Sequence, residues 1–417
     1  MRPARAFTYG GFYWLAASLI ALGCGNAKPI FSGDAFTADP PRPGPLNGMF
    51  VATNNGDDTL SAIDPGSRQT RWTMPVGFIP VELEGPHHIV ADPSGAFFYV
   101  NLSEAVAGSG SGPHGAHGTG TIPGYTLKLS ATDGSLVAFA TVDPNPGDLT
   151  VSADGKTLYV THYDLLKLAR AVQSGDIRQG DSNLYVIDTE GMSVKRRIAL
   201  CPLAHGVHLS SDGQTLYSSC GTDEIAIVNL ASPSPAAQRV LLPGSVESPS
   251  CGHCPYALSI GPDGKVWVSS LGPNAGVSGG GSLHVYDPQL GRFDDGRTVS
   301  LCGRALFAWF EMGVQGSNTY RVYVPEQGPC GDWIRAYRSG PLSQPPTPIG
   351  QLGFSRGDCL NAHMLMGSQD NGTGYLVCEG DHSGPGSLAF VDFASMSLLS
   401  SIRLGVFTDG IALIPSR

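Results

Sequence analysis

Short runs of alternating hydrophobic and polar residues fill the chain from about residue 48 onward. Four segments show the pattern most clearly, each with a strand-like run, a turn that ends in glycine and a second strand-like run. They span residues 86–100, 147–160, 205–217 and 255–268. Glycine accepts the positive φ that tight turns require, so each segment predicts a β-hairpin.

A third apolar run follows each hairpin, and a fourth, more variable run closes the unit. Third runs cover residues 184–188, 225–229, 283–287 and 388–392. Fourth runs include residues 193–200 and 397–404. Four antiparallel strands in a repeat of about fifty residues are typical of one blade of a β-propeller. The pattern therefore predicts an all-β fold.

The turn glycines give the number of blades. They stand at positions 95, 155, 213, 264 and 372. The first three intervals are 60, 58 and 51 residues, whereas the last is 108 and holds two blades. Residues 320–324 and 333–337 supply the middle strands of the extra blade. Six blades are accounted for in this way.

The seventh blade is split between the two ends of the repeat region. Residues 49–77 offer second, third and fourth strands without a first, and residues 409–415 offer a first strand without successors. Joining the two pieces closes the ring and leaves no unpaired sheet edge. We therefore expect residues 48–417 to form a seven-bladed β-propeller of four-stranded antiparallel blades, closed by the C-terminal strand joining the N-terminal blade.

Two short motifs support this interpretation. The run Tyr159-Val160-Thr161-His162 and the third-strand run Val186-Ile187-Asp188 resemble the YVTN family of seven-bladed propellers. The segment from Pro86 to Val100 is also similar to 6-phosphogluconolactonase-like propellers. The likeness covers nearly all of residues 48–417 and implies the fold. It leaves the function open, because the family includes surface-layer proteins, binding modules and subunits of periplasmic oxidoreductases.

The N-terminus has the features of an export signal. Arg2 and Arg5 precede an apolar run from Phe12 to Leu22 that is too short to span a bilayer. The run ends in Ala21-Leu22-Gly23-Cys24, which resembles a bacterial lipobox. The resemblance implies a signal peptide over 1–23, a diacylated Cys24 and a Pro-rich tether over 24–47. The protein would then be lipid-anchored at the periplasmic face of the outer membrane or at the cell surface. An ordinary cleaved signal peptide without a lipid is the alternative.

Composition limits the classes of molecule that the protein is expected to bind. The formal net charge is −10 and only 14% of residues are charged, so a nucleic-acid partner is not expected, because it would need a basic face. The lipid anchor would be the contact with the membrane. The remaining partner would be a protein or a small-molecule ligand that the sequence does not identify, and we expect a monomer.

Eight cysteines remain after Cys24, an even number that indicates disulfides in an exported protein. Two pairs occupy equivalent places in their blades, with partners nineteen positions apart, and a third pair spans a longer connection. The last two cysteines form a Cys-x-x-Cys loop. Equivalent positions thus predict the pairs Cys201–Cys220, Cys359–Cys378, Cys302–Cys330 and Cys251–Cys254. Each pair would stabilise the fold by roughly 2–4 kcal/mol.

Histidines recur where the innermost strands begin. Twelve residues before the second-strand aromatic residue stand His87, His205 and His363 in three of five blades, and Asp409 is the equivalent in the closing strand. These strand starts should open onto the same face as the loops between second and third strands. The candidates for a metal or ligand site at one channel mouth are His87, His88, His162, His205, His363 and Asp409. Loops on the same face add His114, His117 and His382.

Neutral imidazoles together with carboxylates suit Zn, Cu or Ni, and copper or zinc are the cofactors we consider. The first functional hypothesis is a ligand- or protein-binding scaffold module that uses the disulfide-stapled, His-rich face. The second is a copper-type oxidoreductase with a His-ligated metal at the channel mouth. A third, a lactonase-like hydrolase, follows only from the resemblance of the segment around His87. Equally, each repeated histidine could simply donate a hydrogen bond to the backbone of the neighbouring blade.

Overall fold

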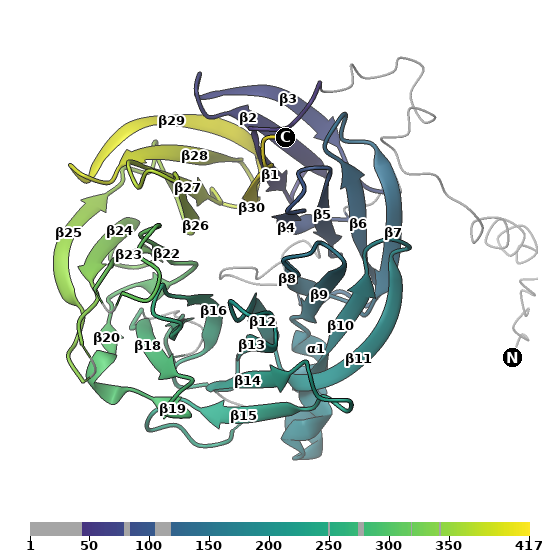
Figure 1. Cartoon of the computed structure of the whole chain (residues 1–417), viewed down its shortest axis with the longest axis vertical. Coiled ribbons are helices and arrows are strands. Elements are labelled where there is room, and N and C mark those ends of the chain that lie inside the picture. Colours follow the sequence, from purple (N-terminus) through teal and green to yellow (C-terminus); the bar gives the residue numbers. More distant parts are fainter. Residues whose placement is uncertain are drawn as a thin grey trace, which may run out of the picture.

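The computed structural model describes residues 44–78, 84–104, 118–248, 251–273, 279–317, 319–341 and 343–417. Seven antiparallel sheets surround a central axis, and the C-terminus lies beside the first blade (Figure 1). The seven-bladed β-propeller that the repeat predicts is thereby confirmed. Within the described residues, blades 5 and 6 each contain one short strand more than four.

Blades are numbered from 1 to 7 in chain order, and strands are named from the axis outward. Blade 1 contains β30 (Thr408–Leu413), β1 (Phe50–Asn54), β2 (Thr59–Asp64) and β3 (Gln69–Pro75). Blade 2 contains β4 (Pro86–Ala91), β5 (Phe97–Leu102), β6 (Gly124–Ser130) and β7 (Leu136–Val142). Blade 3 contains β8 (Pro146–Val151), β9 (Thr157–His162), β10 (Asp181–Asp188) and β11 (Ser193–Pro202).

The second half of the chain repeats this order. Blade 4 contains β12 (Ala204–Leu209), β13 (Thr215–Cys220), β14 (Glu224–Asn229) and β15 (Ala237–Leu241). Blade 5 contains β16 (Pro255–Ile260), β17 (Val266–Ser270), β18 (Ser282–Asp287), β19 (Arg292–Phe293) and β20 (Val299–Ser300). Blade 6 contains β21 (Arg304–Ala305), β22 (Trp309–Phe310), β23 (Arg321–Gln327), β24 (Trp333–Arg338) and β25 (Thr347–Gly353). Blade 7 contains β26 (Ala362–Gly367), β27 (Thr373–Cys378), β28 (Pro385–Asp392) and β29 (Ser397–Val406).

The ring closes as the split blade predicts. Strand β30 pairs antiparallel with β1, with Phe50 opposite Leu413 and Ala52 opposite Ile411. The packing of the ring begins at Leu46, just before the expected boundary at residue 48. The Leu46 side chain is fully buried, and its backbone N–H donates to the carbonyl of Ala131 in blade 2.

Aromatic residues of the second strands pack between neighbouring blades. Tyr99 of blade 2 lies in one apolar cluster with Leu149 and Leu158 of blade 3. Tyr217 of blade 4 packs with Val266 and Val268 of blade 5 in the same way. The side chains of a strand alternate between its two faces, so each sheet buries apolar residues against both neighbours.

Four disulfides lie where the innermost strands begin. They join Cys201 to Cys220, Cys251 to Cys254, Cys302 to Cys330 and Cys359 to Cys378, the pairs that equivalent positions predict. Such bonds persist in oxidising compartments, so the protein belongs to an extracytoplasmic environment. In the described part of the chain, no helix is long and apolar enough to cross a membrane.

The connections contain little helix. Helix α1 (Leu165–Ser174) follows β9, and Asp164 caps it by accepting a hydrogen bond from the N–H of Lys167. Within the described connections, two short 3-10 turns cover Ile177–Gly180 and Asp295–Arg297. Figure 1 shows α1 at the periphery of the ring, away from the central axis.

Candidate functional site

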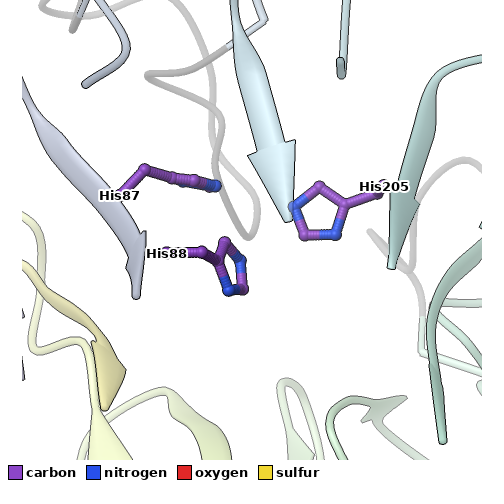
Figure 2. Close-up of side chains that lie close together, drawn as sticks. All are labelled: His87, His88 and His205. Atoms are coloured by element: carbon purple, nitrogen blue, oxygen red, sulfur yellow. The ribbon is translucent and has the colours of Figure 1, made fainter. Parts of the chain in front are cut away.

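In blades 1 to 5 and 7, a bulge near the start of the innermost strand decides which side chains face the central channel. In β4 the pairing with β5 shifts between Pro86 and Ile89, so that His87 and His88 together oppose the single residue Asn101. Consecutive side chains of a regular strand point to opposite faces, whereas a bulge re-aims one of them. Both imidazoles therefore project from β4 into the channel (Figure 2).

The same shift recurs in other blades. It falls between Pro146 and Leu149 in β8, between Ala204 and Val207 in β12, and between Ala362 and Leu365 in β26. Each bulge leaves two residues at the axis. These pairs are Gly147 with Asp148, His205 with Gly206, and His363 with Met364.

Three histidines converge on one point. The ring of His88 lies 4.4 Å from that of His87 and 5.0 Å from that of His205, measured between centroids. One nitrogen of each ring lies within 4.8 Å of the other two, and the side chains are buried. Figure 2 shows His87 and His88 on one strand facing His205 across the channel. The sequence predicted all three residues as candidates at one channel mouth, and the structure brings them together.

Gly147 in β8 leaves room for the His205 side chain. Strand β8 lies between β4 and β12 in chain order, and its residue equivalent to His87 is Gly147. A Cβ atom at Gly147 would lie 3.4 Å from Cδ2 of His205 and 3.2 Å from the Thr161 hydroxyl. Any side chain longer than a methyl group would therefore occupy the space that His205 uses.

Asp409 connects the three histidines to a second group. One of its carboxylate oxygens lies 3.1 Å from Nδ1 of His87, and the other lies 3.3 Å from Nδ1 of His363. Nε2 of His363 is in turn 3.6 Å from a carboxylate oxygen of Glu379. His363, Glu379 and Asp409 form a second buried set of residues that could hold a metal ion.

His363 also donates a hydrogen bond to the backbone of the neighbouring blade, the purely structural role considered above for a repeated histidine. Its Nδ1 lies 2.9 Å from the backbone carbonyl of Asp409 in the neighbouring blade. A carbonyl only accepts, so Nδ1 carries the proton and Nε2 carries the lone pair. Burial lowers the pKa of His363, which keeps this ring neutral.

Asp148 of β8 lies beside His88. Its carboxylate oxygen is 3.5 Å from Nδ1 of His88, and it accepts hydrogen bonds from the N–H groups of Leu149 and Val207. Burial raises the pKa of Asp148 to about 7 despite these hydrogen bonds. The pKa of Asp409 is raised well above its ordinary value, first by burial and then by the nearby charges of Glu379 and Asp148.

Aromatic side chains enclose the three histidines. Tyr256 stacks on His205, with ring centroids 4.0 Å apart and planes 20° apart. Phe307 lies 5.1 Å from His88 and 5.4 Å from His363. The histidine cluster is therefore shielded from bulk water, which strengthens the electrostatic interactions within it.

The other predicted site residues lie elsewhere. His162 ends β9, where its Nδ1 donates to the carbonyl of Asn183 and its ring packs on Tyr185. It belongs to the interior of blade 3, because its side chain is already used between two strands of one sheet. His114, His117 and Cys24 lie outside the described residues, as do the predicted signal peptide and most of the tether.

His382 is joined to the buried groups through Glu379. Its Nε2 lies 2.6 Å from one oxygen of Glu379, whose other oxygen faces His363. The His382 side chain is partly exposed, whereas Glu379 is fully buried. Imidazoles and carboxylates thus alternate from the surface inward, in the order His382, Glu379, His363, Asp409 and His87. Such a series can hold or pass protons between solvent and the three histidines.

Two residues of the site were missed by counting along the sequence. Asp148 follows Gly147, so the same count applied one residue later would have found it beside His88. Tyr256 was not predicted, because the residue twelve positions before Trp267 is Pro255. Ser259 pairs with Trp267, eight residues on, whereas Val90 pairs with Tyr99, nine residues on. The turn between the first and second strands of blade 5 is therefore one residue shorter than that of blade 2. As a result, the residue equivalent to His87 is Tyr256, eleven positions before Trp267.

Comparisons with known proteins agree on the fold. No protein-family model matches the chain, and no curated protein matches its sequence. Solved structures do match. A functionally unknown protein from Desulfotomaculum acetoxidans has a TM-score of 0.63 at 11% identity, covering 89% of this chain and all of that one. A candidate 6-phosphogluconolactonase from Bacteroides uniformis has a TM-score of 0.59 at 12% identity, covering 87% and 98%.

A third match is hydrazine synthase from Kuenenia stuttgartiensis, with a TM-score of 0.57 at 14% identity, covering 80% of this chain and 90% of that one. Identities this low show a shared fold and carry no information about activity. Fold and site together define the class: a disulfide-bonded seven-bladed β-propeller with a buried cluster of histidines and carboxylates at its axis.

Proposed function

We propose that this protein binds a divalent transition-metal ion through His87, His88 and His205, at the end of the propeller channel where the innermost strands begin. Three convergent, buried imidazoles from two blades are the donor set that supports this proposal. Three histidine ligands with a further position left for water or substrate are typical of catalytic zinc sites. Imidazole also suits copper.

The carboxylates beside the rings are the observation that carries the proposal. A metal-bound histidine usually gives its second ring nitrogen to a carboxylate or a carbonyl, which fixes the tautomer and orients the ring. Asp409 lies in this position relative to Nδ1 of His87, at 3.1 Å, and Asp148 relative to Nδ1 of His88, at 3.5 Å. Because a carboxylate lies beside Nδ1 of His87 and beside Nδ1 of His88, Nε2 is the atom of these two rings that would bind the metal.

The spacing of the three imidazoles fits a tetrahedral metal ion after a small contraction. Bonds of about 2.0–2.1 Å to a tetrahedral ion place donor atoms ~3.3 Å apart. One nitrogen of each ring lies within 4.8 Å of the other two, so shifts of the order of 1 Å would bring three donor atoms to this spacing. A divalent ion would also favour ionised Asp148 and Asp409, whose pKa values are raised in its absence.

Metal analysis tests the proposal. After export to an oxidising compartment, removal of metal with a chelator and dialysis against zinc or copper, we expect about one equivalent per chain. His88→Ala and His205→Ala should each weaken binding at least a hundredfold, because each removes a ligand. Asp409→Asn should weaken it roughly 10- to 100-fold, since it changes only the orienting carboxylate.

His253→Ala is the matched control, because His253 lies in the Cys251–Cys254 loop and outside the three-histidine cluster. It should leave the affinity unchanged. If the wild-type protein takes up far less than one equivalent, or if His205→Ala binds metal as tightly as wild type, the metal site does not exist. The propeller would then be a metal-free binding module.

We further propose that the chain is exported and anchored by a lipid on Cys24, on the basis of its lipobox-like sequence. Expressed with its full N-terminus in a Gram-negative host, the wild-type protein should partition into detergent phase and carry a diacylglyceryl group by mass spectrometry. Cys24→Ala should remove the lipid while leaving the propeller folded. Recovery of an unmodified, water-soluble wild-type protein would show that the signal peptide is an ordinary one.

A further inference from the structure

A cavity lies on the other side of the histidine cluster, within the channel. It has a volume of about 350 Å³, and residues from the innermost strands of all seven blades line it. The lining comes from the later parts of these strands, so the cavity opens toward the face that carries the Asp-Gly turns, away from the disulfides. Its size is at the low end of the ~300–1,000 Å³ of small-molecule sites.

A second hollow adjoins this cavity. It has a volume of about 640 Å³ and lies on the same face between blades 4, 5 and 6. The two share His208, Ser259, Ala308 and Trp309 as lining residues. The two hollows are therefore neighbours, separated by no more than these side chains.

The inner end of the cavity touches the histidine cluster through two residues. Asp148 and Phe307 both line it, and both lie beside His88. A carboxylate oxygen of Asp148 is 3.5 Å from Nδ1 of His88, and the ring centroids of Phe307 and His88 are 5.1 Å apart. A molecule that fills the cavity would therefore lie against Asp148, with one residue separating it from the proposed metal ligands.

The described lining is mostly apolar, with a single acidic group. Met364, Met366, Leu149 and Ile411 are among its side chains, and Phe307 and Trp309 add aromatic rings. Among the described residues, neither Lys nor Arg lines the cavity, and burial lowers the pKa of His208 to about 4, which keeps that ring neutral. Asp148 is the one carboxylate, and it is 7% exposed.

We propose that this cavity binds a small hydrophobic amine in its ammonium form, with the ammonium group against Asp148 and the apolar body along the channel. A carboxylate in an apolar pocket favours an opposite charge and disfavours a like one. The faces of Phe307 and Trp309 also attract cations. An anionic ligand would find no cationic side chain among the described lining residues. Such an amine would lie next to the proposed metal centre, and its binding does not require the metal.

Three ligands with the same aromatic body separate charge from apolarity: 2-phenylethylamine, the neutral 2-phenylethanol and the anionic 3-phenylpropionate. Calorimetric titrations use the whole exported protein after chelation, so that metal contributes nothing. The amine should bind at least roughly tenfold more tightly than the alcohol, and the carboxylate should not bind measurably. Equal binding of amine and alcohol would overturn the proposal.

Two variants locate the site. Asp148→Asn removes the charge at nearly constant shape and should weaken amine binding at least tenfold. Thr150→Phe fills the cavity from the same face of β8, two residues after Asp148, and should abolish binding while leaving the carboxylate in place. Asp154→Asn, in an exposed turn, is the control. If both cavity variants fold, as judged by circular dichroism, and still bind amine like wild type, the inference is wrong. Metal content, measured separately, shows whether the proposed metal site stands.

Discussion

A chain that ends at Phe407, without strand β30, is expected to lose the cooperatively folded propeller. Strand β30 is the innermost strand of blade 1 and pairs with β1, so its removal leaves that blade with three strands and an open inner edge. The neighbouring blades 2 and 7 would each lose packing against it. Open edges of this kind favour pairing between chains and aggregation.

The size of the effect follows from what β30 and the residue after it bury. Ile411, Ala412 and Ile414 are 3%, 5% and 0% exposed. Burying an isoleucine side chain contributes about 1.5–3 kcal/mol, so these residues alone supply several kcal/mol. That is comparable with the roughly 5–15 kcal/mol by which most native proteins are stable. The truncation should therefore remove most of the stability of the ring.

Thermal unfolding followed by circular dichroism, together with size-exclusion chromatography, measures this outcome. The control is a chain that ends at Pro415, which lacks only the two exposed residues Ser416 and Arg417. It should melt within a few degrees of the full chain. If the chain ending at Phe407 stayed monomeric and melted cooperatively near the full-length temperature, ring closure by β30 would contribute far less than we infer.

The metal-free protein should lose stability as pH rises to neutrality, and Asp148→Asn should remove part of this loss. The pKa of Asp148 is about 7 in the folded protein and 3.8 in its ordinary state. The folded protein therefore holds a proton that the unfolded chain releases. The resulting stability is fully present below pH ~4 and is lost as pH rises through ~7.

A difference of about three pH units in pKa corresponds to about 4 kcal/mol, at 1.36 kcal/mol per unit. The amide introduced by Asp148→Asn cannot ionise, so the free energy of unfolding of the variant relative to wild type should rise by a few kcal/mol between pH 4 and pH 8. Comparing variant with wild type at each pH is necessary, because other groups titrate as well. Burial lowers the pKa of His162 to about 4, which makes stability rise with pH in the lower part of this range.

Denaturant unfolding at a series of pH values, with a chelator present, gives the comparison. Asp154→Asn serves as the control. The Asp154 side chain is exposed, and the hydrogen bond from the Ser152 hydroxyl lowers the pKa of its carboxyl, so its small effect should have the opposite sign. A difference between Asp148→Asn and wild type that stayed constant from pH 4 to pH 8 would show that Asp148 is ionised throughout.

The architecture was predictable from the sequence because each blade is built from local contacts. Hairpins follow from alternation and turn glycines, and the number of blades follows from their spacing. Even the split blade was visible, since one end of the repeat lacked a first strand and the other lacked the rest. The disulfides were predictable for the same reason. Cys201 and Cys359 hold equivalent positions, and so do Cys220 and Cys378.

The site was only partly predictable. His87, His88 and His205 were candidates because equivalent positions in a ring of blades lie around one axis. His162 was a candidate by the same reasoning and lies within its own sheet, because the residue at the end of a second strand faces the third strand rather than the axis. Asp148 and Tyr256 were not predicted, although they lie beside His88 and His205.

The sequence by itself determined the seven blades, their closure and the cysteine pairs, because these depend on periodicity and on contacts between neighbouring strands. The tertiary structure decided which groups meet at the axis. A bulge of one residue turns both His87 and His88 inward, Gly147 leaves room for His205, and Asp409 from the opposite end of the chain lies between His87 and His363. Distances across the channel depend on these bulges and on the curvature of the closed ring, neither of which is written in the period of the pattern.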